Sequence, residues 1–173
     1  MDKPLVGIVM GSNSDVERLK GAFDVLKELE VPFEVTIASA HRTPNDVVNY
    51  AKKARGRGIM VIIAAAGLSA ALPGVLASHT TLPVIGLPLE AGPLKGMDAL
   101  LAIAQMPPGI PVATVGIGQA VNAALLAVQI LSIQDASWSK KIAQYREKAS
   151  KKVSTAREAL TELPKAPPEV FLD

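Results

Sequence analysis

The sequence predicts a three-layer α/β sandwich built on a five-stranded parallel sheet, with an extra helix at the C-terminus. Five short apolar segments, rich in branched side chains, alternate along the chain with segments of helical periodicity. The connections between the apolar segments are too long for hairpins, so each connection crosses a face of the sheet and carries a helix there. The length of 173 residues suits one domain, and the absence of cysteine means that no disulfide stabilises it.

The strands are predicted from apolar runs that end at glycine, proline or small polar residues. The first run reads PLVGIVM and stops at Gly11, and the third run reads IMVIIAA. Such uninterrupted runs are typical of strands that are buried on both faces of a parallel sheet. The five strands are expected over residues 4–10, 33–38, 59–65, 83–87 and 111–117.

The helices are predicted from start signals and from apolar residues spaced three or four apart. Ser14 or Asp15 can cap the first helix, and Pro44 stands at a first-turn position of the second. The five helices of the sandwich are expected over residues 14–30, 44–55, 72–78, 97–105 and 119–132.

The last of these helices, QAVNAALLAVQILS, contains no charged residue. A helix on the outside of a sandwich normally shows a polar face to water, so this helix calls for a second protein surface. We therefore expect an obligate homo-oligomer. The alternative is a monomer in which the terminal helix packs over an unusually apolar core helix.

Residues 136–163 have the pattern of one long charged helix. Its apolar positions form a single stripe, which consists of Ile142, Tyr145, Ala149, Val153, Ala156 and Leu160. Residues 1–163, including this terminal helix, are expected to form a single α/β domain. Residues 164–173, which contain three prolines, are expected to form an irregular arm.

The composition argues against two classes of protein, those that bind nucleic acid and those that span a membrane. The net charge is +2, and aromatic residues make up only 3%, which argues against nucleic acid as a partner. Residues 58–134 contain only Glu90, Lys95 and Asp98 as charged residues, a scarcity that would also suit membrane spans. Repeated prolines and glycines cut this region into pieces shorter than a spanning helix, and the N-terminus has no convincing signal peptide. We expect a cytoplasmic protein that binds no membrane.

Ligands of an open parallel sheet bind at the carboxyl ends of its strands, where the strand order reverses. The loop after the first strand, GSNSD, combines a glycine turn with hydroxyls and with backbone donors at a helix start, which suits an oxyanion or a polyol. Asp15 suits the hydroxyls of a ribose better than a phosphate, so we expect a ligand that carries both. The alternative is that Ser12 and Asp15 only cap the helix.

The loop after the second strand, SAHRTP, begins at Ser39 and contains one of the two histidines. Arg42 can bind a phosphate through two N–H groups, and the imidazole of His41 can move a proton near neutral pH. The alternative is a histidine that caps a turn beside an arginine in a surface salt bridge.

The loop after the third strand, AGLSAALPG, offers little side-chain chemistry. Small residues let a flat ligand approach the backbone at Gly67, and Ser69 can add a hydrogen bond; close packing alone is the alternative. His79 has no acidic neighbour and is expected to be structural. Two distant histidines without an acidic cluster argue against a metal site, and the signatures of hydrolases, P-loops and classical dinucleotide sites are absent.

These loops together resemble a known family. The motifs G-S-N-S-D, S-A-H-R-T-P, A-A-G-x-S-A-A-L-P-G, P-V-I-G-L-P, Q-M-P-P-G-I-P-V-A-T-V and N-A-A-L-L-A follow one another in the order seen in the phosphoribosylaminoimidazole carboxylase catalytic-subunit family, across about residues 4–133. In most bacteria, members of this family act as N5-carboxyaminoimidazole ribonucleotide mutases of purine biosynthesis. The resemblance implies a flavodoxin-like fold and a homo-octamer, without metal or cofactor.

The resemblance also implies roles for the loop residues. Ser12, Asp15 and Arg42 look like the family's ribonucleotide contacts, and His41 looks like its catalytic histidine. The implied reaction moves a carboxylate from an exocyclic nitrogen to the adjacent ring carbon through carbon dioxide. It requires a closed pocket that retains carbon dioxide and one group that first gives and then takes a proton.

The third loop departs from the family pattern. Bacterial mutases usually carry G-G-A-A-H-L-P-G there, whereas this chain has Ala71 in place of the histidine. The A-G-x-S-x-A-L pattern is closer to the class that carboxylates 5-aminoimidazole ribonucleotide directly with carbon dioxide. The sequence therefore favours a mutase and leaves direct carboxylation open. A non-enzymatic nucleotide-binding or flavin-binding module also fits the topology, although aromatic residues that would stack on a flavin are missing from the loops.

Overall fold

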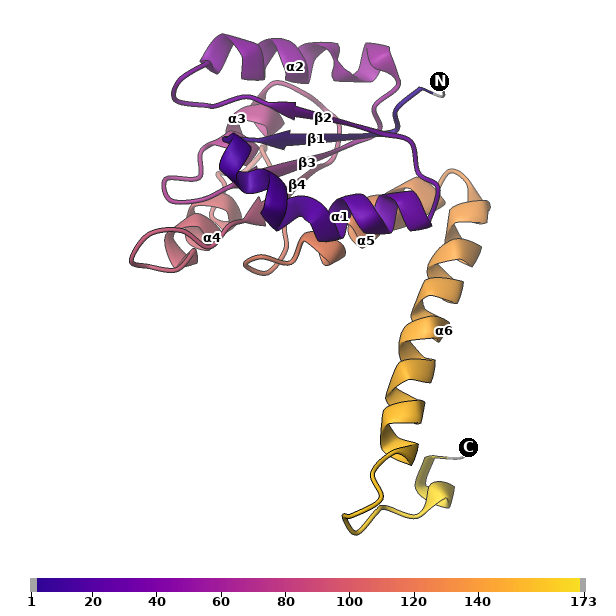
Figure 1. The fold of residues 1–173 in the computed structure, drawn as a ribbon. Coiled ribbons are helices and arrows are strands. Elements are labelled where there is room, and N and C mark those ends of the chain that lie inside the picture. Colours follow the sequence, from indigo (N-terminus) through magenta and orange to yellow (C-terminus); the bar gives the residue numbers. More distant parts are fainter. Residues whose placement is uncertain (1–2, 172–173) are drawn as a thin grey trace.

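The computed structural model describes residues 3–171 and confirms the predicted sandwich (Figure 1). Five parallel strands stand in the order β2-β1-β3-β4-β5, so the strand order reverses between β1 and β3. The strands are β1 (Val6–Met10), β2 (Phe33–Ile37), β3 (Val61–Ala66), β4 (Val84–Pro88) and β5 (Ala113–Thr114).

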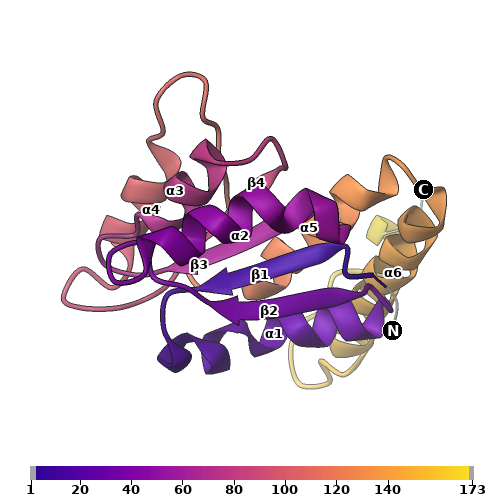
Figure 2. The same cartoon turned by 90° about the horizontal axis from the view of Figure 1, so that it is seen from above.

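Helices cover both faces of the sheet, as Figure 2 shows from above. The helices are α1 (Val16–Glu28), α2 (Pro44–Arg57), α3 (Leu72–Ser78), α4 (Met97–Ala104), α5 (Ala120–Ser132) and α6 (Ala136–Glu158). Side chains of β1 alternate between the two faces: Ile8 and Met10 belong to the core under α1 and α5, and Val9 belongs to the core under α2, α3 and α4. This alternation explains why β1 reads as a continuous apolar run.

The fifth strand is much shorter than predicted. Residues 111–117 were expected to be extended, but only Ala113 and Thr114 pair with β4. β5 lies at the edge of the sheet, and neither of its residues is buried, so it lacks the two-sided packing that holds β1, β3 and β4. Pro111 has no N–H group to give to the sheet, which further limits pairing.

The uncharged helix α5 is largely covered within one chain. Six of its residues are buried, and Leu125, Leu126 and Ile130 pack against the same core while partly exposed. α1 and α6 lie beside α5 and supply the cover that its sequence seemed to require from a second protein surface. The expectation of an oligomer therefore gains no support from this helix. None of the helices within residues 3–171 is long and apolar enough to cross a membrane.

Helix α6 is attached by its first half and then projects away from the sandwich (Figure 1). Ile142 is buried against the core, but beyond residue 148 the apolar residues of the predicted stripe are exposed. The helix ends at Glu158 and not at residue 163 as predicted. The last turns of α6 do not pack on the sandwich, and the nearby Pro164 cannot continue a helix.

The expected arm, residues 164–173, lies within the described residues except for 172–173. Its described part contains one short 3-10 helix, η2 (Pro168–Phe171). The guanidinium of Arg157 lies 3.7 Å from the centre of the Phe171 ring, so the arm turns back onto the end of α6.

Candidate active site

The structure brings the predicted site residues together. The carboxyl ends of β1, β2 and β3, toward which the arrowheads point in Figure 1, surround a cavity of about 580 Å³. This is the place where the strand order reverses and where open parallel sheets bind ligands. All seven residues chosen from the sequence line this cavity: Ser12, Asp15, Ser39, His41, Arg42, Gly67 and Ser69.

In the loop after β1, Ser12 caps a helix start and Asp15 does not. The Ser12 hydroxyl accepts a hydrogen bond from the backbone N–H of Ser14 at 3.3 Å and caps the short 3-10 helix η1 (Asn13–Asp15). Asp15 stands at the N-cap position of α1, but its side chain makes no capping hydrogen bond. Ser12 therefore caps a helix start and Asp15 does not, so the alternative in which both residues only cap the helix fails at Asp15. The Asp15 carboxylate is buried and lines the cavity.

The loop after β2 holds Arg42 without a carboxylate partner. Its Nη2 donates to the carbonyl oxygen of Gly11 at 3.0 Å, and its Nε donates to the Ser39 hydroxyl at 3.4 Å. Ser39 is itself fixed, because its backbone N–H donates to the Thr43 hydroxyl at 3.0 Å. Within residues 3–171 no ion pair involves Arg42, so the surface-salt-bridge interpretation is wrong. The guanidinium brings an uncompensated positive charge to the cavity.

His41 lines the same cavity but is exposed in the single chain. No side-chain hydrogen bond fixes its ring among the described residues. One chain therefore does not form the closed pocket that we expected from the chemistry. Closure requires a conformational change or a further surface.

The loop after β3 approaches the loop after β4 closely. A Cβ atom at Gly67 would lie 3.1 Å from the Cβ of Ala91, so the small residue is needed for this approach. Leu68 has a left-handed backbone with φ of 54°, and its side chain lies over Gly92. This strained leucine is half exposed and lines the cavity together with Ser69.

Two residues of the cavity lining, Arg18 and Ala91, lie outside the three loops that the sequence singled out, and Leu68 lies within the third loop but was given no role there. Arg18 could have been found, because it stands one helical turn after Asp15, a spacing at which side chains meet. Leu68 carried no such signal, since nothing in the residue type indicates a left-handed backbone. Ala91 reaches the cavity only because of the path that the loop between β4 and α4 takes.

The second histidine lies far from this cavity. His79 lines a larger cavity of about 990 Å³, which also contains Lys52 and Arg55 and lies toward the amino ends of β4 and β5. The Nδ1 atom of His79 is 2.9 Å from the carbonyl oxygen of Val75 and 2.9 Å from the Ser78 hydroxyl. These local contacts suit the structural role predicted for it. Among the described residues, no cluster of three or more His, Asp or Glu side chains could hold a metal ion.

Comparisons with known proteins agree with this geometry. The family model described as AIR carboxylase matches residues 5–152. A protein of Aquifex aeolicus named N5-carboxyaminoimidazole ribonucleotide mutase is 61% identical over 140 residues, which cover 81% of this chain and 84% of that protein. Phosphoribosylaminoimidazole carboxylase of Saccharomyces cerevisiae is 53% identical over 153 residues, which cover 88% of this chain but only 27% of that protein.

A solved structure shows the same architecture. The crystal structure of Treponema denticola PurE matches with a TM-score of 0.82 and 31% identity, over 92% of this chain and 99% of that chain. The match agrees with the flavodoxin-like fold that the resemblance implied. Since the family model matches residues 5–152 and a relative with 61% identity covers 81% of the sequence, the chain belongs to the AIR carboxylase family.

Proposed function

We propose that this protein is an N5-carboxyaminoimidazole ribonucleotide mutase. It moves a carboxylate from the exocyclic nitrogen to C4 of the imidazole and gives 4-carboxy-5-aminoimidazole ribonucleotide, in purine biosynthesis. One observation carries this proposal: His41, Arg42 and Asp15 line one cavity and offer a proton carrier, a free cation and a buried carboxylate. The high identity to a relative named as this mutase supports it.

The cavity divides the binding of a ribonucleotide between its loops. Arg42 carries an uncompensated charge and suits the phosphate, with the Ser12 hydroxyl beside it. Asp15 suits the ribose hydroxyls, because an ionised carboxylate only accepts hydrogen bonds. Gly67 and Ser69 form the wall on which the flat imidazole would lie. In this arrangement the residues on three strand ends orient one ligand.

His41 performs the proton transfers of the proposed reaction. Its imidazolium gives a proton to the exocyclic nitrogen as the N–C bond of the carbamate breaks and carbon dioxide leaves. C4 then attacks the carbon dioxide, and the neutral imidazole takes the proton that C4 loses. The two transfers cancel, so no co-reactant is consumed. Recombination is efficient only if carbon dioxide stays beside the ring.

Retention of carbon dioxide requires closure that the single chain lacks, so we include self-assembly in the proposal. Exposed apolar side chains gather on the loops after β3 and β4 and on α4: Leu68, Leu94, Met97 and Leu101. Burying such side chains against another copy would be favourable. A homo-oligomer, an octamer as the family resemblance implies, and a cytoplasmic location complete the proposed function.

Direct carboxylation of 5-aminoimidazole ribonucleotide with carbon dioxide is the second candidate. Ala71 lines the cavity at the position where mutases of the family carry a histidine. His41 is therefore the one imidazole in this cavity among the described residues. A single imidazole serves direct carboxylation as well, because that reaction needs only removal of the C4 proton.

Parallel assays with both substrates separate the candidates. A mutase converts N5-carboxyaminoimidazole ribonucleotide at low bicarbonate, and product appears at a rate independent of added carbon dioxide. A direct carboxylase leaves that carbamate largely unconverted and forms product from 5-aminoimidazole ribonucleotide and carbon dioxide. Tight nucleotide or flavin binding with neither reaction would contradict both and leave a binding module.

A further inference from the structure

Arg18 is a second arginine in the candidate active site, and its partner is the buried carboxylate. It lies on α1, one turn after Asp15, and its Nη1 donates to Asp15 Oδ1 at 3.2 Å. Asp15 is the one charged residue that is buried within residues 3–171. Removing a carboxylate from water is unfavourable unless a partner compensates it, and Arg18 is that partner.

The next ion pair on the same helix provides a direct comparison. Lys20 and Glu17 have the same i,i+3 spacing, but their side chains are 61% and 73% exposed, and neither lines the cavity. The side chain of Asp15 is only 12% exposed, and that of Arg18 is 44% exposed. Exposed ion pairs contribute little to stability. A buried carboxylate, in contrast, depends on its partner to offset the loss of water. Arg18 therefore differs from the exposed ion pair on α1, because its partner is a buried carboxylate in the cavity.

The contact uses only one oxygen of the carboxylate. Arg18 holds Oδ1, and the Asp15 side chain does not cap α1. Within the described part of the chain, no hydrogen bond to Oδ2 is found, and Oδ2 is not among the enclosed atoms that lack a partner. Oδ2 is thus open to a ligand in the cavity that Asp15 lines.

We propose that Arg18 is a positioning residue that fixes the Asp15 carboxylate so that Oδ2 receives the ribose hydroxyls of the substrate. Through Asp15 it would select ligands with an intact ribose over ligands that lack these hydroxyls. The inference rests on the proposed function, because it takes the ligand to be a ribonucleotide. It assigns no proton transfer to Arg18 and no contact with the reacting atoms.

Three variants test this role in the full-length protein. Arg18→Met keeps much of the side-chain length but removes the donor, and Arg18→Lys restores one donor. Lys20→Met is the matched control, since it breaks the exposed pair on the same helix. The ligands are the product, 4-carboxy-5-aminoimidazole ribonucleotide, and its 2′,3′-dideoxy analogue. Calorimetry gives the Kd of each ligand, and initial rates with N5-carboxyaminoimidazole ribonucleotide, the proposed substrate, give KM and kcat.

The expected result is selective for ribose. Arg18→Met should raise KM and the Kd of the product roughly tenfold, equal to about 1.4 kcal/mol, while kcat changes less than about twofold. The Kd of the dideoxy analogue should change little, Arg18→Lys should recover part of the loss, and Lys20→Met should match the wild type.

Two results would overturn the proposal. An equal loss of affinity for both ligands would show that Arg18 contacts the phosphate or only supports the fold. Wild-type affinity in Arg18→Met would show that Asp15 needs no positioning. Failure of the proposed function would be seen first and separately, because the wild-type protein would then convert neither substrate. Failure of the role of Arg18 alone would leave the wild-type protein active and the variants unchanged in their selectivity for ribose.

Discussion

Arg42 Nη2 donates a hydrogen bond to the carbonyl oxygen of Gly11 at 3.0 Å and thereby joins the loop after β2 to the turn after β1. These two strands are neighbours in the sheet, so the bond ties the two loops at the edge where a ligand would bind. The arginine both shapes the cavity and brings a positive charge that no carboxylate within residues 3–171 compensates.

Removal of this guanidinium should weaken ligand binding strongly. Arg42→Met loses the bond to Gly11 and the charge for the phosphate, so we expect KM to rise roughly 30-fold or more, since a charged hydrogen bond is worth about 1.5–3 kcal/mol. Arg42→Lys should recover only part, because lysine cannot bind through two N–H groups. The exposed Arg146→Met on α6 is the control. Unchanged KM in Arg42→Met would remove Arg42 from the phosphate site.

Replacement of His41 should affect turnover and not binding. His41→Asn removes the proton carrier while keeping a polar side chain, so kcat should fall roughly 100-fold or more, with the Kd of the product within about threefold of the wild type. His79→Asn is the matched control, because His79 lies in the other cavity. The assay is steady-state kinetics combined with calorimetry. Substantial kcat in His41→Asn would contradict the proposed mechanism.

The central strands of the sheet were the most directly predictable part of the fold. β1 and β3 are buried at every residue, and their continuous apolar runs showed this directly. The strand predicted over residues 111–117 was too long, because only Ala113 and Thr114 pair with β4 and Pro111 has no N–H group to give to the sheet. The end of α6 was also misplaced, since an exposed stripe has the same periodicity as a packed one.

The site was predictable to the extent that topology determines it. Parallel strands bring their carboxyl ends to one edge, so residues as distant in sequence as Ser12, His41 and Ser69 could be grouped from the order of strands and loops alone. Exposure was not predictable in the same way: His41 lines the cavity but is exposed in the single chain, and nothing in the sequence pattern indicated this. The partner of Asp15 required the side-chain geometry of Arg18.

Placement of a side chain at Gly67 should damage the site without unfolding the protein. The added Cβ of Gly67→Ala would lie 3.1 Å from the Cβ of Ala91, so the loops after β3 and β4 must separate by a few tenths of an ångström. We expect KM to rise roughly three- to tenfold, with a loss of stability of about 1 kcal/mol. Gly56→Ala on α2, where the Cβ has open space and the residue does not line the cavity, is the control. Kinetics and urea unfolding separate the two effects.

The ion pair between Glu34 and Arg57 should make stability depend on pH. Burial opposes ionisation of Glu34, but the hydrogen bond of Arg57, the nearby Tyr50 hydroxyl and the charge of Arg57 together outweigh it and hold the pKa of Glu34 below its ordinary value of 4.5. A lowered folded-state pKa contributes stability that is present above pH 4.5 and is lost as the pH falls through the folded-state pKa.

Glu34→Gln should therefore cost about 1 kcal/mol or less at pH 7, because the pair is partly exposed, and the difference should shrink below pH 4.5. Urea unfolding at several pH values measures it. In an Arg57→Met background the substitution should have little effect at any pH. A difference that persists undiminished at low pH would exclude this ion pair as its source.

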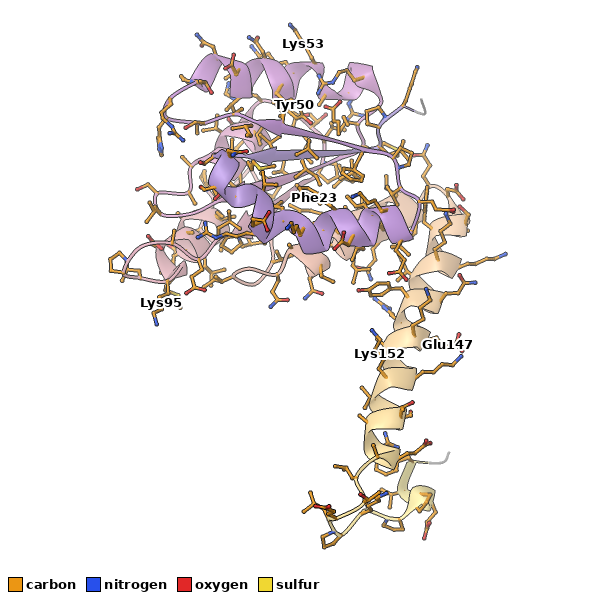
Figure 3. The ribbon with its side chains drawn as sticks, viewed as in Figure 1. Phe23, Tyr50, Lys53, Lys95, Glu147 and Lys152 are labelled. Atoms are coloured by element: carbon orange, nitrogen blue, oxygen red, sulfur yellow. The ribbon has the colours of Figure 1, made fainter. Side chains whose placement is uncertain are left out.

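Gly7 of β1 and Tyr50 of α2 should be energetically coupled. Figure 3 shows Tyr50 under α2, above the sheet, and its hydroxyl occupies the place that a Cβ at Gly7 would take. That hydroxyl is buried and makes no hydrogen bond of standard geometry within the part of the chain that the structure describes, although it lies near enough to Glu34 to help lower the pKa of that carboxylate. Gly7→Ala should therefore destabilise the protein by about 1–3 kcal/mol, through overpacking between the sheet and α2.

Tyr50→Phe should be nearly neutral or stabilising by up to about 1 kcal/mol, because it removes an unsatisfied buried hydroxyl. The double variant should then lose clearly less stability than the sum of the single variants, since phenylalanine vacates the contested space. The ring carbon next to the hydroxyl remains close, so recovery should be partial. Gly56→Ala, a helical position of α2 with open space around it, should gain about 0.5–1 kcal/mol and controls for the change in backbone freedom. If the changes in the free energy of unfolding of the two single variants simply add in the double variant, the residues are not coupled. The Tyr50 hydroxyl would then not be the group that a Cβ at Gly7 disturbs.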